Sequence, residues 1–376
     1  MDDFNIRAPG TLRDPLTGKK LCRRCIYALF PKLRHIDSLE MDTGWRPTNS
    51  PGRCSGDDRT EIFLVEKGLG DERVVEFAQN LIVHDSREDP WMTKTNPCWY
   101  VNETNDVDDD ALPYHPVKTL NLSKNQFGDE GLIALAKVFQ TPSCVALERV
   151  MLGGNPNIGL TGIEALSVAL GRTSCRIKCL SLAKCCIGNE ESRALAVGLK
   201  SNKHMTELLL HSNVIGNTGA DALGKALTNH PNLKYLDLSD NTIGDAGLQG
   251  LAEGLAHNTT LKHLYLNDIR ASTNGLRFLV QLVKHTNHHI KAITTMETVH
   301  SYQSISEDYS RLSDRDKIVD ELEFYLSLNQ NGRSFLRQEP PVNLLAWALA
   351  KVRQKPDLLY GLLREIPHMW SASSIS

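Results

Sequence analysis

A pair of cysteines near the N-terminus has a spacing seen in metal and redox sites. Cys22 and Cys25 form a Cys-x-x-Cys pair, with Cys54 and His35 as further candidate zinc ligands. The alternative is that the two cysteines are small residues on a short helix. No second Cys-x-x-Cys or His pair follows at a workable distance, so we favour the helix and expect no metal ion.

Two further groups have side chains that bind ions. The acidic run Val107–Asp110 offers carboxylates for calcium, but it lacks the spaced oxygens, glycine and terminal glutamate of an EF-hand loop. His285, His288 and His289 follow a predicted helix, where polar or positive groups interact favourably with the helix C-terminus. We expect the acidic run to be solvated surface and the histidines to interact with the helix end rather than with a metal ion.

Acid–base groups recur along the later part of the chain, namely Glu207, His211, Tyr235, Asp237 and His263. A catalytic pair needs a dry concave pocket that shifts pKa values. The sequence shows no nucleophile beside a base and no phosphate-binding loop, and the stretch from Thr17 to Lys19 lacks the rest of a Walker motif. Whether a pocket exists depends on the elements that carry these residues.

Those elements form a repeat with a step of 28 to 30 residues. Each copy has an apolar residue, two variable residues, Leu-x-Leu, a turn, a glycine and an apolar stripe at helical spacing. The copies begin at Val117, Leu147, Ile177, Met205, Leu233, Leu261 and Ile290. The pattern predicts a short strand followed by an amphipathic helix. Because one copy cannot bury both elements, stacked copies should form an open solenoid, which offers no dry pocket.

The turn of each copy carries a residue suited to burial, in the order Asn125, Asn155, Cys185, Asn213, Asn241 and Ile269. A buried Asn or Cys side chain there can bond the free backbone groups of the tight turn. Ile269 breaks this ladder, and no helical stripe follows Ile290. We therefore expect the regular array to end near residue 295.

This pattern resembles the leucine-rich repeat family, in particular its long ribonuclease-inhibitor-like class. The motif Leu-x-x-Leu-x-Leu-x-x-Asn, followed by glycine and a helix rich in alanine and leucine, is matched in consecutive copies over about half of the chain. The resemblance implies an α/β fold, a right-handed leucine-rich-repeat solenoid or horseshoe. Its parallel sheet would be concave, with outer helices and a helical C-terminal cap.

The repeat divides the chain into an irregular N-terminal segment with a short helix (1–58), the solenoid (59–296) with an insertion (85–115), a linker (297–312) and the helical cap (313–367). The cap should begin at Ser313, whose hydroxyl and the acid at Asp316 form a helix-start signal. Part of the cap resembles the tail of uncharacterised repeat proteins of diatom-type algae.

Composition sets the expected cellular context. The formal net charge is −3 and 41% of residues are hydrophobic, so no strong field attracts nucleic acid or an anionic membrane. The longest apolar run, Leu344–Ala350, is far short of a bilayer span. The acidic start lacks the layout of a secretory signal, so the nine cysteines indicate reduced thiols. We expect a cytoplasmic, or else nuclear, protein that binds neither nucleic acid nor membrane.

Residues between the buried strand positions point to the concave face and form columns across the sheet. The densest group of large polar and aromatic side chains predicts a partner-binding site of Arg149, Glu207, His211, Tyr235, Asp237, His263 and Tyr265. The alternative is that any solenoid must place polar groups there. Lysines recur at the second strand position, but Glu148 and Thr206 interrupt them, so we expect a solvated edge rather than a phosphate-binding row.

We expect a non-enzymatic protein–protein recognition scaffold without cofactors, which binds a protein partner on its concave face. The alternative is a regulator of a small GTPase, because long repeats of this class are similar to the Ran GTPase-activating proteins, although the long acidic tail of that family is absent. A third hypothesis, inhibition of a nuclease, is implied by the class name alone. Ribonuclease-inhibitor proteins have more repeats and a more acidic concave face.

Overall fold

The computed structural model describes residues 61–83, 118–141, 147–295, 313–331, 333, 348–352 and 355–365. The chain divides into two compact units, of which unit 1 holds Met1–Ile187 and Val197–Leu209, and unit 2 holds Gly188–Ala196 and Leu210–Ser376. The predicted N-terminal segment, with its cysteine pair, and the predicted insertion and linker lie outside the described residues. The domain limits given above therefore stay predictions.

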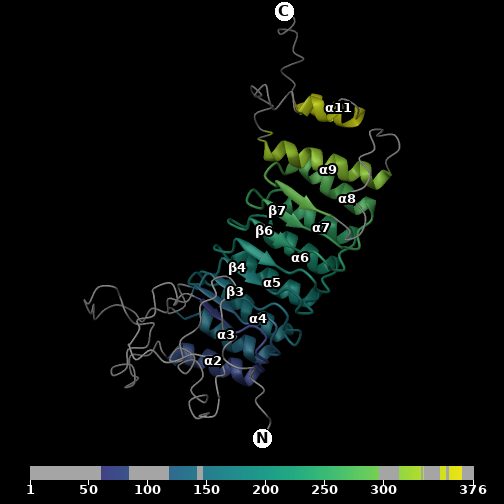
Figure 1. Ribbon diagram of the computed structural model, residues 1–376. Coiled ribbons are helices and arrows are strands. Elements are labelled where there is room, and N and C mark those ends of the chain that lie inside the picture. Colours follow the sequence, from purple (N-terminus) through teal and green to yellow (C-terminus); the bar gives the residue numbers. More distant parts are fainter. Residues whose placement is uncertain are drawn as a thin grey trace, which may run out of the picture. The chain divides into compact units, whose positions relative to one another are not determined.

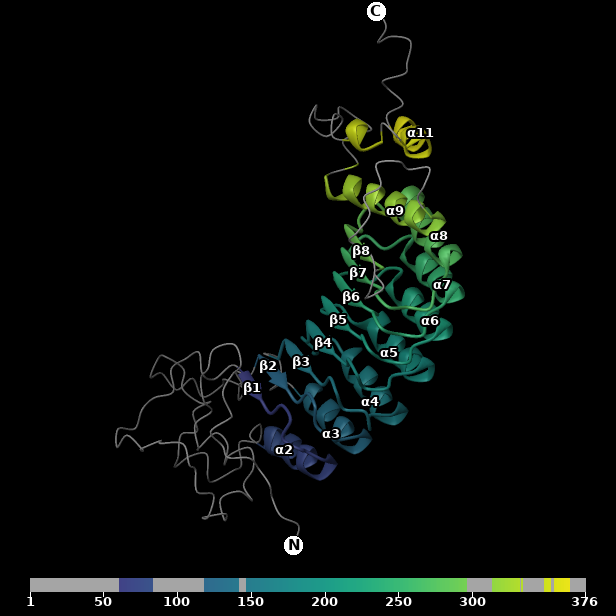
Figure 2. The same ribbon diagram turned by 45° about the vertical axis from the view of Figure 1, so that its right-hand side comes forward.

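Unit 1 alternates strands and helices. Its strands are β1 (Glu61–Phe63), β2 (Thr119–Asn121), β3 (Arg149–Met151), β4 (Cys179–Ser181) and β5 (Glu207–Leu209), and its helices are α2 (Asp71–Val83), α3 (Asp129–Phe139), α4 (Leu160–Leu170) and the last part of α5 (Asn189–Ser201). Each strand pairs parallel with the next in chain order. The helices of this unit follow one side of its strands (Figure 2).

Unit 2 repeats the same arrangement. Its strands are β6 (Tyr235–Asp237), β7 (His263–Tyr265) and β8 (Ala292–Thr294), and its helices are the first part of α5, α6 (Asn217–Leu227), α7 (Asp245–Leu255), α8 (Thr273–Gln281) with the π-helical turn η5 (Leu282–Thr286), α9 (Asp314–Gln330) and α11 (Pro356–Glu365). The strands again pair parallel in chain order. Figure 1 shows α7, α8 and α9 following one another in this unit. The expected α/β leucine-rich-repeat solenoid is confirmed.

The core of each repeat is the one that the leucine pattern predicts. In β6, Leu236 and the following Leu238 are fully buried, while Asp237 between them is half-buried. In α7, the buried stripe includes Leu248 and Leu251. Strand and helix therefore enclose one apolar layer, and the intervening strand residues stay on the opposite face. None of the described helices is long and apolar enough to cross a membrane.

The turn ladder forms as predicted. Asn155 is fully buried, and its Nδ2 donates to the carbonyl oxygens of Leu122 (3.1 Å) and Leu152 (2.7 Å). Cys185 takes the same position one repeat later, and its Sγ donates to the Leu152 carbonyl at 3.3 Å. In unit 2, Asn241 bonds the turn carbonyls in the same way. These side chains satisfy backbone groups that would otherwise be buried without partners.

The C-terminal helices of unit 2 begin where the sequence predicts. Ser313 and Asp316 form a capping box, in which the Ser313 hydroxyl accepts from the Asp316 amide at 3.2 Å. Helix α9 then packs against α8. Lys355, just before α11, donates to the Asp320 carboxylate on α9. The cap is thus built from helices that lie on the last repeat and on each other.

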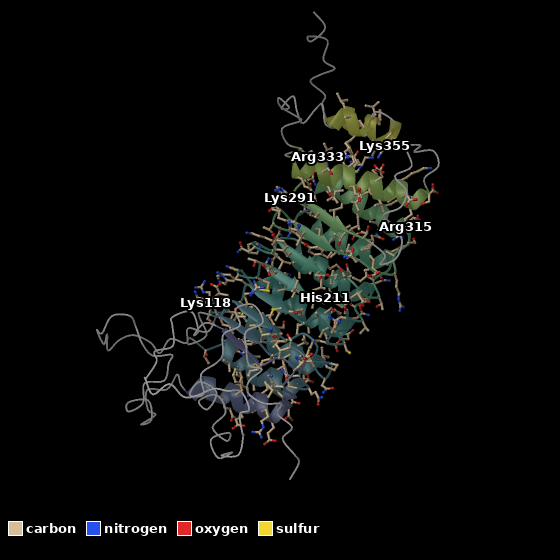
Figure 3. The ribbon with its side chains drawn as sticks, viewed as in Figure 1. Lys118, His211, Lys291, Arg315, Arg333 and Lys355 are labelled. Atoms are coloured by element: carbon tan, nitrogen blue, oxygen red, sulfur yellow. The ribbon has the colours of Figure 1, made fainter. Side chains whose placement is uncertain are left out.

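Helix α9 also supplies polar contacts to the last repeat. Asn329 Nδ2 donates to the carbonyl oxygen of Ile290 at 2.9 Å, just before β8. Arg333, labelled in Figure 3, is almost fully buried, and its Nη1 donates to the Val283 carbonyl at 2.6 Å. These bonds give partners to carbonyls near the start of η5 and just before β8, where no further repeat follows to supply them. The cap therefore supplies hydrogen-bond donors to backbone carbonyls of the last repeat and also covers its apolar face.

Candidate functional site

Six of the seven predicted partner-binding residues lie on strands, and His211 lies two residues after the end of β5. Arg149 and Glu207 belong to unit 1, and five belong to unit 2, namely His211, Tyr235, Asp237, His263 and Tyr265. The predicted columns are confirmed within each unit, since Cys179 pairs with Glu207 and Tyr235 pairs with His263. The role of these residues in binding stays a prediction.

On unit 1, Arg149 and Glu207 bind each other. The Arg149 Nη1 lies 3.6 Å from the Glu207 Oε2, although the strand that carries Cys179 runs between theirs. Cys179 is 1% exposed beneath this pair. Burial, the largest cause, raises the pKa of the Cys179 thiol to about 12. The Arg149 charge opposes this rise, and Glu207 adds to it by accepting the thiol hydrogen bond. A residue between the buried strand positions can therefore itself be buried, as Cys179 is.

On unit 2, three rings form what we call the aromatic stack, made of Tyr235, His263 and Tyr265. The Tyr235 and His263 rings lie 4.6 Å apart between centroids, with 5° between their planes. The His263 and Tyr265 rings are 6.5 Å apart and inclined by 14°. Tyr235 is 37% exposed. The stack therefore presents an ordered apolar surface whose tyrosines also carry a polar hydroxyl.

The other two predicted residues of unit 2 have local roles. The Asp237 carboxylate accepts a hydrogen bond from the backbone N–H of Ser239 at 3.0 Å, which supports the turn after β6. Asp237 also pairs in register with Tyr265, so it borders the aromatic stack. His211, labelled in Figure 3, lies 3.3 Å from its neighbour Ser212, between Nδ1 and Oγ. The structure thus groups Asp237 with the aromatic stack.

Beside the aromatic stack lies a set of cations, here called the lysine row, made of Lys234, Lys262 and Lys291. Each comes directly before a strand of unit 2. The backbone N–H of Lys262 donates to the Lys234 carbonyl, and that of Lys291 to the Lys262 carbonyl, both at 2.9 Å. The three side chains therefore start from adjacent strands, about 4.8 Å apart. Figure 3 labels Lys291 at the end of this row.

The lysine row carries uncompensated charge within the described part of the chain. Lys234 and Lys291 are exposed, and the Lys262 Nζ donates to the Thr259 carbonyl at 3.1 Å. Burial is the first cause that lowers the pKa of Lys262, and the charges of Lys291 and Lys234 lower it further. Burial also lowers the pKa of His263, with Lys291 as the second cause. Positive charge therefore accumulates along this edge.

Unit 1 has a different edge at the same register. Its residues before the strands include Lys178 and Glu148, which form an ion pair with 2.7 Å between Nζ and Oε1. Over the whole array, sequence analysis argues against a phosphate-binding row because Glu148 and Thr206 interrupt the lysines. The signal that it missed is that unit 2 holds lysine at this position in three successive copies without interruption.

The sequence offers histidines and cysteines as candidate metal ligands. Within the described ranges, no three His, Cys, Asp or Glu side chains come together in a way that could hold a metal ion. That set includes His285, His288 and His289. The cysteine pair at Cys22 and Cys25 lies outside the described residues.

The comparison with protein families agrees with the repeat pattern. A family model described as Leucine Rich repeat matches residues 115–136, 201–224 and 229–252. Among solved structures, the chain is similar to internalin C2 from Listeria monocytogenes, at 18% identity over 65% of this chain and 76% of that chain, with a TM-score of 0.34. It is also similar to the actin-binding site 2 of leiomodin-1, at 15% identity over 55% of this chain and 93% of that one, with a TM-score of 0.33. No curated protein matches the sequence.

Proposed function

The chain is a leucine-rich-repeat protein, and we propose that it acts as a non-enzymatic recognition scaffold that binds a protein partner on the strand face of unit 2. The observation that carries this proposal is the aromatic stack. Tyr235 and His263 stand on adjacent strands with their rings already parallel. Partner binding would then cost little side-chain entropy, because the anchors are ordered before contact.

The aromatic stack has the composition of an interface centre. Tyrosine is enriched among residues that dominate binding energy, since it offers apolar area and a hydroxyl together. The fold itself does not need these rings, because the buried positions of the same strands are filled by Leu236 and Leu264. A large ring kept on the solvent face without a packing role supports a role in recognition.

Unit 1 is the weaker candidate surface. Arg149 and Glu207 already bind each other, so a partner would have to break or share that ion pair. An exposed pair of this kind contributes roughly 0.2–1 kcal/mol, which a partner can offset but gains little from. We therefore rank the predicted residues of unit 2 above those of unit 1.

Three more specific predictions from the sequence stay proposals. They are the ribonuclease-inhibitor-like class, the cytoplasmic or nuclear location and the similarity of the cap to diatom-type repeat proteins. Regulation of a small GTPase also stays an untested alternative. Single-turnover GTP hydrolysis with a panel of GTPases separates it from plain binding, because only a regulator changes the rate.

A site-specific crosslinker tests the proposed surface. The photoreactive residue benzoylphenylalanine is placed at Tyr235, and in a matched protein at Tyr360, which is 67% exposed on α11. After illumination in cells, the Tyr235 position should capture a protein that the Tyr360 position does not. Capture of the same proteins from both positions, or of none from Tyr235, contradicts the proposal.

A further inference from the structure

We infer that the segment bound by unit 2 is an acidic, extended stretch of protein whose carboxylates contact Lys234, Lys262 and Lys291. This inference rests on the proposed function and names the chemistry of the partner. The segment would run across the strands, along the lysine row, with its apolar side chains against the aromatic stack. Three observations support it.

The first observation is geometric. The lysine row begins on adjacent strands that are joined by backbone hydrogen bonds from Lys262 to Lys234 and from Lys291 to Lys262. Ammonium groups on strands about 4.8 Å apart can reach consecutive carboxylates of a chain that crosses the strands. The residues after Lys234 and Lys262 are Tyr235 and His263, so charge and rings occupy parallel lines. A partner therefore meets both together.

The second observation is electrostatic. The charges of Lys234 and Lys291 each disfavour the charge on Lys262, so the folded unit carries repulsion along this edge. Among the described residues, no carboxylate pairs with the row, whereas Lys178 of unit 1 is paired with Glu148. A partner carboxylate would relieve this repulsion and add attraction of its own. The row thus carries excess positive charge, which the carboxylates of an acidic segment would neutralise.

The third observation favours protein over nucleic acid. Single-stranded nucleic acid binds by placing bases on free ring faces. Here the facing sides of the Tyr235 and His263 rings are already in contact, with centroids 4.6 Å apart. Asp237 pairs in register with Tyr265 and would repel a phosphate backbone lying across the rings, whereas the inferred segment places only apolar side chains there and its carboxylates on the lysine row.

Fluorescence anisotropy with a labelled eight-residue oligoglutamate tests the inference on the full chain. The variant Lys234→Gln/Lys262→Gln/Lys291→Gln removes the row. The matched control, Lys137→Gln/Lys184→Gln/Lys200→Gln, removes three exposed lysines of unit 1, so both variants change the net charge equally. We expect oligoglutamate to bind the unchanged protein, to bind the row variant about tenfold or more weakly, and to bind the control almost normally. Raising the salt concentration should weaken this binding.

Several outcomes overturn the inference. They are no binding of oligoglutamate at low salt, equal binding by the row variant, or tighter binding of a labelled oligouridylate of equal length. The proposed function fails separately, when the crosslinker at Tyr235 captures no distinct protein. A captured partner that binds the row variant as tightly as the unchanged protein sinks the acidic-segment inference and leaves the proposed function standing. Circular dichroism and thermal melting confirm that both variants are folded.

Discussion

Arg149 and Glu207 are joined by an ion pair across the strand between them, and the thiol of Cys179 lies buried beneath that pair. The pair contributes little to stability as an exposed contact. Its effect is local: burial, the largest cause, holds the pKa of Cys179 near 12, the Arg149 charge opposes this rise, and Glu207 adds to it. Thiolate is the reactive form of cysteine, so Cys179 should be inert in the folded chain.

This relationship predicts a change in cysteine chemistry. Replacing Glu207→Ala removes the acceptor and the negative charge that raise the pKa of Cys179 and opens part of its cover, while Arg149, whose charge lowers that pKa, remains. Alkylation of Cys179 by iodoacetamide should therefore become at least about fivefold faster. Cys186, which is exposed, should react quickly in both proteins. Peptide mapping by mass spectrometry measures each site. Arg193→Ala, which breaks an unrelated exposed ion pair with Glu190, should leave Cys179 unreactive. Fast labelling of Cys179 in the unchanged protein contradicts the account.

A second prediction concerns the close approach of α6 and α7 in unit 2. A Cβ at Gly254 would clash with the carbonyl oxygen of Gly224, a backbone atom that cannot move aside without moving its helix. Alanine normally favours a helix over glycine by about 1 kcal/mol. Here Gly254→Ala should instead destabilise the protein by roughly 1–3 kcal/mol, because the helices must separate.

Denaturant unfolding measures this effect against Gly171→Ala. Gly171 has a φ of −72°, and a Cβ there would have its nearest neighbours at 3.5 Å, so the change should be tolerated. Equal stability of the two variants would show that α6 and α7 do not pack this closely.

A third prediction is a pH dependence of stability. His230 is 3% exposed, and its Nδ1 accepts the backbone N–H of Leu233 at 3.0 Å. Burial lowers the pKa of His230 to about 4, against about 6.5 in an unfolded chain. Between these values the unfolded chain takes up a proton that the folded chain does not. Stability is therefore full above about pH 6.5 and falls as the pH decreases towards 4, by up to about 3 kcal/mol.

The next repeat shows which residue at the position of His230 would remove the pH dependence of stability. Asn258 stands one step after His230, and its Oδ1 accepts the N–H of Leu261 at 2.8 Å, as His230 does for Leu233. His230→Asn should keep the turn and flatten the loss of stability between about pH 6.5 and 4. Urea unfolding at several pH values measures it. The same slope in both proteins would mean that another group titrates.

The repeat architecture could be predicted because it depends on local patterns that recur. Leu236 and Leu238 alternate, and Asn155 and Asn241 recur at the turn, so strand, core face and turn bonding follow from spacing alone. The capping box at Ser313 is equally local, since it needs only four consecutive residues. Each of these features is decided within one copy of the repeat.

The surface could be predicted only in part, because it depends on how neighbouring copies interact. The columns were predictable, but whether Arg149 binds Glu207, or Tyr235 stacks on His263, depends on side-chain length and rotamer across strands. The pKa of Lys262 likewise depends on the charges of Lys234 and Lys291 on the adjacent strands. Such pairings lie between copies that are 28 or more residues apart.

The affinity for the partner captured at Tyr235 tests the central claim most directly. Isothermal titration with purified partner compares the unchanged protein, the double variant Tyr235→Ala/Tyr265→Ala, and Tyr360→Ala as an exposed tyrosine outside the surface. Loss of an aromatic anchor at an interface centre costs about 2 kcal/mol or more, so the double variant should bind about thirtyfold or more weakly at an almost unchanged melting temperature. Tyr360→Ala should bind normally. A double variant that is folded and binds the partner with unchanged affinity would contradict recognition by the aromatic stack.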